Sequence, residues 1–176
     1  MNIDFSKYTW AAVEVINANL CENAKAAAGK NSEGYAAAQQ LWESSPRQLP
    51  LTEALQLANR CHRLAPFLNF NGNTFVAIFR LVISEQVSLP STQKAALNSF
   101  AGHYIAGTIT PAEERALSLL LAAGGAPLAV GDQVQSLQGN VRGVIKEILP
   151  DGSVWIKTPV MGTVKTLLDA LVRQAG

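Results

Sequence analysis

The N-terminal part of the chain repeats apolar residues at steps of three and four, which is the spacing of an amphipathic helix. Trp10, Val13 and Ile16 begin the first such run. Further runs follow, each bounded by glycine, proline or a residue that can cap a helix. Helices are therefore expected to begin near Trp10, Tyr35, Leu51, Phe75, Ser91 and Pro111. Short connections between these six helices predict a compact helical bundle.

The clearest helix start is the segment Thr110-Pro111-Ala112-Glu113. Threonine followed three residues later by glutamate forms a capping box, in which each side chain bonds the backbone N–H of the other residue. Proline suits the first helical position because the N–H that it lacks would have no partner there. The cap and the helix dipole account for Glu113, so its adjacency to Glu114 does not indicate a catalytic carboxylate pair.

The last third of the chain changes to the two-residue alternation of β-strands. Val154 and Ile156 should face one side of a sheet, and Trp155 and Lys157 the other. Before them, the Pro-Asp-Gly sequence at 150–152 is typical of a tight hairpin turn. Similar turns separate five apolar runs, which predict short strands at residues 133–137, 141–149, 153–158, 164–168 and 171–173.

Three glycine-containing motifs mark these strands: Gly131-Asp132-x-Val134, Gly143-x-Ile145-x-x-Ile148 and Gly152-x-Val154-x-Ile156. With the order of five short strands, they resemble the SH3-like small β-barrels, and more narrowly the KOW and Tudor-like group. The resemblance implies a five-stranded barrel whose role is binding, because such barrels bind RNA, DNA, ribosomes, proline-rich peptides, methylated side chains or a neighbouring domain. An aromatic cage or polyproline groove needs several rings, and Trp155 is the only aromatic residue after Pro127.

These patterns together predict an α+β protein of two domains. Residues 1–126 form the α-helical domain, and residues 127–176 form the SH3-like barrel. The boundary is placed at Gly124-Gly125-Ala126-Pro127, a flexible glycine pair followed by a stiff proline. The resemblance to a known family does not extend to the helical domain.

Charge changes the interpretation of the barrel's role. The chain carries 14 basic and 13 acidic residues, and five of the basic and four of the acidic residues follow Pro127. Proteins that bind phosphate backbones usually have a clear basic excess. The charged fraction of 15% is below the roughly 25% of typical soluble domains, and a low value suits an apolar interface. A protein partner is therefore favoured over RNA or DNA, and self-association is also compatible with the composition.

Two groups of residues are candidate binding sites. In the barrel, Arg142, Lys146 and Lys157 could lie on one sheet face beside Trp155, giving a stacking platform with several cations. The alternative is an ordinary solvated face with Trp155 packed against the helical domain.

The second candidate patch is in the helical domain, where Arg60, Arg63 and Arg80 flank the asparagine-rich segment 67–74. This segment is either a recognition loop with aromatic anchors or a connection in which asparagine and glycine make the turn and the phenylalanines enter the core.

No motif indicates catalysis. Cys21 and Cys61 lack the spacing of a zinc site, and the sequence contains no phosphate loop, dinucleotide fingerprint or nucleophile elbow. Cys61 and His62 are adjacent on a predicted helix, so their side chains diverge by about 100°. We therefore expect no catalytic residue, metal or cofactor. An enzyme of unrecognised type around Cys61, His62 or His103 is the remaining alternative.

The chain contains no apolar run close to the roughly 20 residues that span a bilayer, and residues 1–5 do not resemble a signal peptide. A cytoplasmic location without membrane association is expected. The resulting hypothesis is a non-enzymatic binding or adaptor protein with a protein partner. The alternatives are a nucleic-acid or ribonucleoprotein accessory factor that binds through the barrel, and an unrecognised small enzyme.

Overall fold

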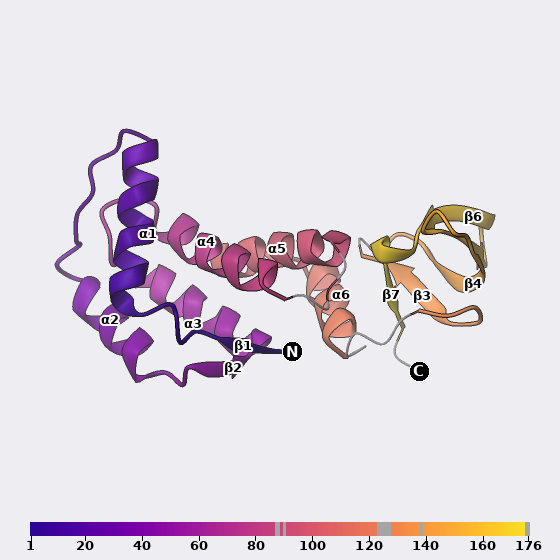
Figure 1. Cartoon of the computed structure of the whole chain (residues 1–176), viewed down its shortest axis with the longest axis horizontal. Coiled ribbons are helices and arrows are strands. Elements are labelled where there is room, and N and C mark those ends of the chain that lie inside the picture. Colours follow the sequence, from indigo (N-terminus) through magenta and orange to yellow (C-terminus); the bar gives the residue numbers. More distant parts are fainter. Residues whose placement is uncertain (87–88, 90, 123–127, 138, 175–176) are drawn as a thin grey trace. The chain divides into compact units, whose positions relative to one another are not determined.

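A computed structural model of the chain describes residues 1–86, 89, 91–122, 128–137 and 139–174 (Figure 1). Within them, six α-helices in the N-terminal part precede a five-stranded antiparallel sheet, so the predicted α+β class is confirmed. The chain divides into two compact units. The helical unit comprises Met1–Gln86 and Ala101–Thr108, and the sheet unit comprises Val87–Phe100 and Ile109–Gly176. The predicted boundary at 124–127 lies outside the described residues.

Every predicted helix is present. The bounds are α1 Trp10–Asn23, α2 Tyr35–Ser44, α3 Leu51–Arg63, α4 Asn71–Ser84, α5 Ser91–Ala106 and α6 Pro111–Ala122. The capping box at the start of α6 is formed as predicted. The backbone N–H of Thr110 donates to Glu113 Oε2 over 2.9 Å, and the N–H of Glu113 donates to Thr110 Oγ1 over 3.2 Å. In the described part of the chain, no helix has the length and apolar character needed to cross a membrane.

Helix α4 begins at Asn71, several residues earlier than the sequence pattern indicates. Phe70 precedes it in the left-handed region, with φ 58°. The amide of Asn71 accepts from the N–H of Phe67 and donates to its carbonyl, both over 2.8 Å. Phe67 is only 4% exposed, so segment 67–74 has the features of a helix connection with an aromatic residue in the core.

The helical unit also contains a small sheet that the sequence pattern did not predict. Strand β1 (Asn2–Asp4) pairs with β2 (Gln48–Pro50) in antiparallel register, with Ile3 opposite Leu49. Both central residues are buried. A three-residue strand is too short to show a two-residue period, and its partner is far away in the sequence.

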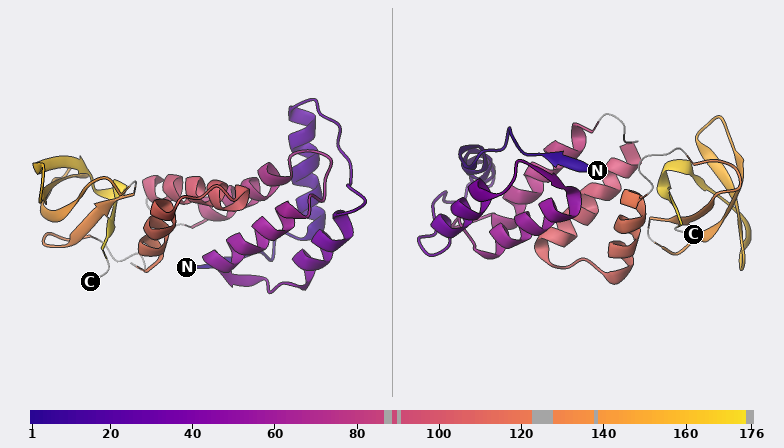
Figure 2. Two further views of the ribbon diagram at one scale, coloured as in Figure 1. Left: turned by 180° about the vertical axis from the view of Figure 1, so that it is seen from behind. Right: turned by 90° about the horizontal axis from the view of Figure 1, so that it is seen from below.

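Four strands of the C-terminal sheet form a meander, β3 (Gln133–Ser136), β4 (Arg142–Ile148), β5 (Ser153–Thr158) and β6 (Gly162–Leu167). After a 3₁₀ turn at Leu168–Ala170, β7 (Leu171–Arg173) returns to pair with β3. All five predicted strands are present, in the spatial order β6-β5-β4-β3-β7. Figure 2 shows that the strands twist strongly around one another.

The sheet is not closed into a barrel, which corrects the sequence-based expectation. Among the described residues, no ladder joins the two outermost strands β6 and β7. The short β7 provides only three residue pairs, and all of them are with β3. Helix α6 contacts the sheet at β7.

The sheet has its own hydrophobic core. It consists of five buried residues, Val134, Ile145, Val154, Ile156 and Leu171, with Leu128, Ile148 and Leu168 packed around them. The predicted alternation in β5 is confirmed, because Val154 and Ile156 are fully buried, Trp155 is half-buried and Lys157 is exposed. The sheet therefore has one face toward this core and one outer face.

An ion pair connects the first and last strands of the sheet. Asp132 Oδ2 accepts from Arg173 over 2.6 Å and from the N–H of Ala129 over 2.8 Å. The hydrogen bond from Arg173, followed by that from Ala129, lowers the pKa of the Asp132 carboxyl below its ordinary value. A carboxyl with a lowered folded-state pKa stabilises the fold above its unfolded pKa, about 3.9, and loses this effect as the pH falls through the folded value.

Asp132→Asn should therefore destabilise the sheet at pH 7, and the difference from the wild type should disappear as the pH falls below about 4. Urea unfolding at several pH values, followed by the amide NMR signals of β3 and β7, would measure it. Glu147→Gln, at an exposed residue of β4, is the control and should change little. A deficit in Asp132→Asn that stays the same through pH 3 would contradict the expected pH dependence.

Candidate functional site

The strand register defines the outer face around Trp155. Residues directly opposite each other in an antiparallel pair lie on the same face. Trp155 is opposite Glu147 of β4 and Lys165 of β6, and Lys157 is opposite Val144 and Thr163. The outer face thus includes Arg142, Val144, Glu147, Ser153, Trp155, Lys157, Thr163, Lys165 and Leu167, and it continues on β3 with Gln133 and Gln135.

Three of the four predicted barrel residues share this face. Trp155 and Lys157 are two positions apart on β5, and Arg142 is two positions before Val144, the residue opposite Lys157. Arg142 and Lys157 are thus diagonal neighbours, which in a sheet lie about 7–8 Å apart. Lys146 occupies the bulge between Ile145 and Glu147, where the alternation is interrupted, so the register does not place it with the others.

Lys165 and Glu147 flank Trp155 directly, and sequence reasoning did not single them out. The alternation of Thr163, Lys165 and Leu167 after the β5–β6 turn could have identified Lys165. Once the length of the turn is known, this alternation places Lys165 opposite Trp155. Lys165 Nζ is also 3.6 Å from Asp151 Oδ2, with both side chains largely exposed. Such an exposed pair leaves the lysine accessible to another anion.

Charge on the outer face is more basic than in the chain as a whole. Lys157 and Lys165 are direct neighbours of the half-buried Trp155, and Arg142 lies diagonally from Lys157. Glu147, opposite Trp155 on β4, is the one carboxylate among the outer-face residues. Within the described residues, no hydrogen bond or ion pair engages the side chains of Arg142 or Lys157. A near-neutral chain thus has an excess of basic residues on the sheet face that carries Trp155, and such a surface suits an anionic or acidic partner.

The second predicted patch is less organised. Arg60 and Arg63 are exposed on α3, and Arg80 is exposed on α4. Arg63 Nε donates to Asn59 Oδ1 over 3.2 Å, and Asn59 Nδ2 donates to the carbonyl of Ile105 over 2.9 Å. Arg63 therefore supports a contact between α3 and the end of α5. Among the described residues, no hydrogen bond brings the three arginines together.

The residues of the enzyme alternative are placed unfavourably for catalysis. Cys61 is fully buried, and burial raises the pKa of its thiol to about 12, so the nucleophilic thiolate is scarce at neutral pH. Burial, and then the charge of Arg63, lowers the pKa of the half-buried His62. His103 is exposed on α5. In the described part of the chain, no group of three or more histidine, cysteine or acidic residues could hold a metal ion.

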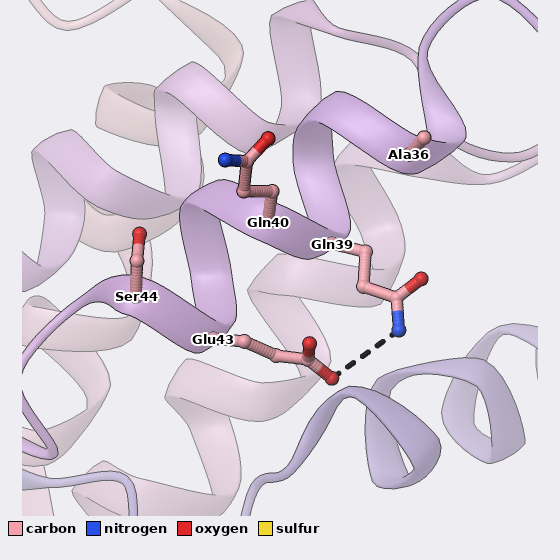
Figure 3. Close-up of a pocket in the computed structure, with 5 residues that line it drawn as sticks. All are labelled: Ala36, Gln39, Gln40, Glu43 and Ser44. Carbon is pink, nitrogen blue, oxygen red and sulfur yellow. Dashed lines mark hydrogen bonds between the residues drawn. The ribbon is translucent and has the colours of Figure 1, made fainter.

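Two surface hollows in the described part of the chain are each lined by a single helix. One, of about 450 Å³, is on α2 and is lined by Ala36, Gln39, Gln40, Glu43 and Ser44, which Figure 3 shows. All its lining residues come from one helix, and Gln39 Nε2 donates to Glu43 Oε1 over 3.3 Å. A second hollow is likewise lined by residues of α6 alone. Ligand sites are usually enclosed by several elements, so the outer face of the sheet remains the candidate site.

Comparison of the chain with models of known protein families found no match. Comparisons with curated proteins and with solved structures also found no match.

Proposed function

We propose that this chain is a non-enzymatic binding or adaptor protein whose outer sheet face binds an acidic region of a protein partner. The observation that carries the proposal is that Trp155 shares one face of the sheet with Lys157, Lys165 and Arg142, of which the first two are its direct neighbours. Tryptophan and arginine are enriched among the residues that dominate binding energy at protein interfaces. The surrounding cations give selectivity for acidic partners.

We further propose that the C-terminal sheet is an open relative of the SH3-like small barrels, in the KOW and Tudor-like group. Its support is a four-strand meander with a fifth strand that returns to pair with the first. The three glycine motifs that carry the resemblance each lie at a strand of the sheet. Gly131 is before β3, Gly143 is within β4 and Gly152 is before β5.

The test is affinity capture from native lysate at two salt concentrations, with and without nuclease. Wild type is compared with Trp155→Ala combined with Lys157→Ala. The matched control is Arg60→Ala combined with Arg63→Ala, which removes exposed cations from α3. We expect a defined protein that survives nuclease, and recovery should fall at least about tenfold in the sheet variant but not in the control. Equal recovery by the two variants would refute the outer face as the binding site.

Single-stranded nucleic acid is the second candidate ligand. The favouring observation is Lys165 opposite Trp155, because a ring flanked by cations suits base stacking beside a phosphate backbone. Titration of labelled RNA and DNA oligonucleotides at about 50 and about 200 mM salt would distinguish the two candidates. Binding that weakens steeply with salt and requires Trp155, together with loss of all captured protein after nuclease, would replace the protein partner with a nucleic acid.

A further inference from the structure

Strand β6 forms one edge of the sheet and pairs on one side with β5. The ladder runs through six consecutive pairs, from Ser153 opposite Leu167 to Thr158 opposite Gly162, without a register shift. Among the described strands, none pairs with the other side of β6. The opposite edge strand, β7, has only three residues and contacts α6. The edge of β6 is thus the longer and more regular of the two.

The hydrogen-bond pattern shows which backbone groups face the open edge. The N–H of Leu168 donates to the carbonyl of Gly152 over 2.9 Å, so this pair is hydrogen-bonded just beyond the ladder. Bonded and non-bonded pairs alternate in an antiparallel ladder. The backbone groups of Val164 and Thr166 therefore bond to β5. Those of Thr163, Lys165 and Leu167 point to the open edge.

Proteins usually protect such edges by bulges, prolines, charged residues or a covering element. Within β6 the only charged residue is Lys165, and there is neither a proline nor a bulge. Exposed apolar side chains lie at both ends of the edge, with Val160 (92% exposed) and Met161 (57%) in the turn before β6 and Leu167 (53%) as its last residue. An uncovered edge with exposed apolar neighbours is suited to strand addition by an extended peptide.

Charge identifies the kind of peptide. The outward side chains near this edge include Lys165 and Lys157, which are on the outer face of β6 and β5. An added strand with acidic residues on that face would place them beside Lys165, while Lys157 lies one strand further in and adds to the positive charge of the face. A second copy of this chain would instead bring two basic outer faces together, and like charges oppose pairing. An acidic strand therefore complements the edge better than self-pairing does.

We infer that β6 binds an extended acidic segment of a partner protein by strand addition, with the main-chain groups of Thr163, Lys165 and Leu167 as the hydrogen-bonding positions. The inference rests on the proposed function and specifies its partner. The partner's acidic side chains lie beside Lys165, and its alternate side chains lie on the inner side of the sheet with Val164 and Thr166.

Amide hydrogen exchange followed by NMR tests this inference on the full chain. The probe is a seven-residue peptide of alternating glutamate and valine, and its control is the matching lysine and valine peptide. In the free chain, the amides of Thr163, Lys165 and Leu167 should exchange faster than those of Val164 and Thr166. The acidic peptide should slow exchange of the first three at least about tenfold, and the basic peptide should not.

Leu167→Pro removes one edge N–H and keeps every charge. Proline is compatible with this site because Leu167 has φ −87° and ψ 139°, near the proline range. We expect it to weaken the acidic peptide about fivefold relative to Leu167→Ala, which keeps the N–H. Lys165→Glu should reverse the preference between the two peptides.

Equal protection by both peptides, or none by the acidic peptide, would overturn the inference. Protection that increases with protein concentration alone would identify a second copy as the occupant and would also overturn it. If Leu167→Pro captures the cellular partner as well as Leu167→Ala does, while the Trp155 and Lys157 double variant does not, strand addition is wrong and the proposed function stands. If both variants still capture the partner as the wild type does, the proposed function itself is refuted.

Discussion

Replacing Gly34 by alanine should destabilise the helical unit by about 3 kcal/mol or more, at the upper end of the cost of overpacking. Gly34 is the buried residue before α2, with φ −104° and ψ −19°, so its backbone conformation is open to any residue. Space is the constraint. A Cβ atom at Gly34 would lie 1.5 Å from the carbonyl oxygen of Leu64 and 2.7 Å from its carbonyl carbon.

The contacting atoms belong to the backbone at the end of α3, so they cannot turn away as a flexible side chain could. Two further backbone contacts hold the segments together there. The N–H of Asn31 donates to the carbonyl of Pro66 over 2.8 Å, and Lys30 forms a β-bridge with Phe67. Accommodating the methyl group would require α2 and α3 to separate.

Gly102→Ala is the matched control, because a Cβ atom there meets nothing within 4 Å and Gly102 lies inside α5. Alanine should stabilise that helix by about 0.5–1 kcal/mol. Urea unfolding monitored by circular dichroism measures both variants. A Gly34→Ala protein within about 1 kcal/mol of the wild type would show that α3 does not approach the start of α2 this closely.

Ile156→Ala should destabilise the sheet by about 2–5 kcal/mol. Ile156 is fully buried in the core of five residues, opposite the equally buried Ile145. Small domains rarely have more than about 3–5 kcal/mol of stability from one hydrophobic core. The substitution should therefore unfold most of the sheet at room temperature, while the helical unit, whose core contains other residues, stays folded.

Amide NMR signals distinguish these outcomes, since β3 to β7 report the sheet and α1 to α4 report the helical unit. Ile156→Val should cost only about 0.5–1.5 kcal/mol. Val160→Ala, at a residue 92% exposed, should stay within about 0.5 kcal/mol of the wild type. Simultaneous loss of signals from both units in Ile156→Ala would show that the helical unit depends on the sheet.

Local sequence patterns predicted the helices and the C-terminal strands well. The capping box at Thr110 and Glu113 forms within four consecutive residues, so no distant contact is needed to specify it. The alternation of Val154, Trp155, Ile156 and Lys157 also identified the buried and outer faces. The pairing of β1 with β2 escaped prediction because it joins two three-residue segments that are distant in the chain.

The candidate site was predicted only in part, for a related reason. Trp155, Lys157 and Arg142 were expected on one face, and the register places them there. Lys146 was expected with them, but the bulge interrupts the alternation at that residue. Lys165 was not singled out, because its position opposite Trp155 depends on the register between two strands.

The sequence by itself determined that there are six helices and five C-terminal strands, which residues alternate into the sheet core, and that the chain has almost no net charge. These properties depend on residues close together in the chain. Only the tertiary structure decided that the sheet stays open, that β6 is an edge strand and that Lys165 lies opposite Trp155. Such features arise from strand register and from the packing of distant segments, where a shift of one residue would move a side chain to the opposite face.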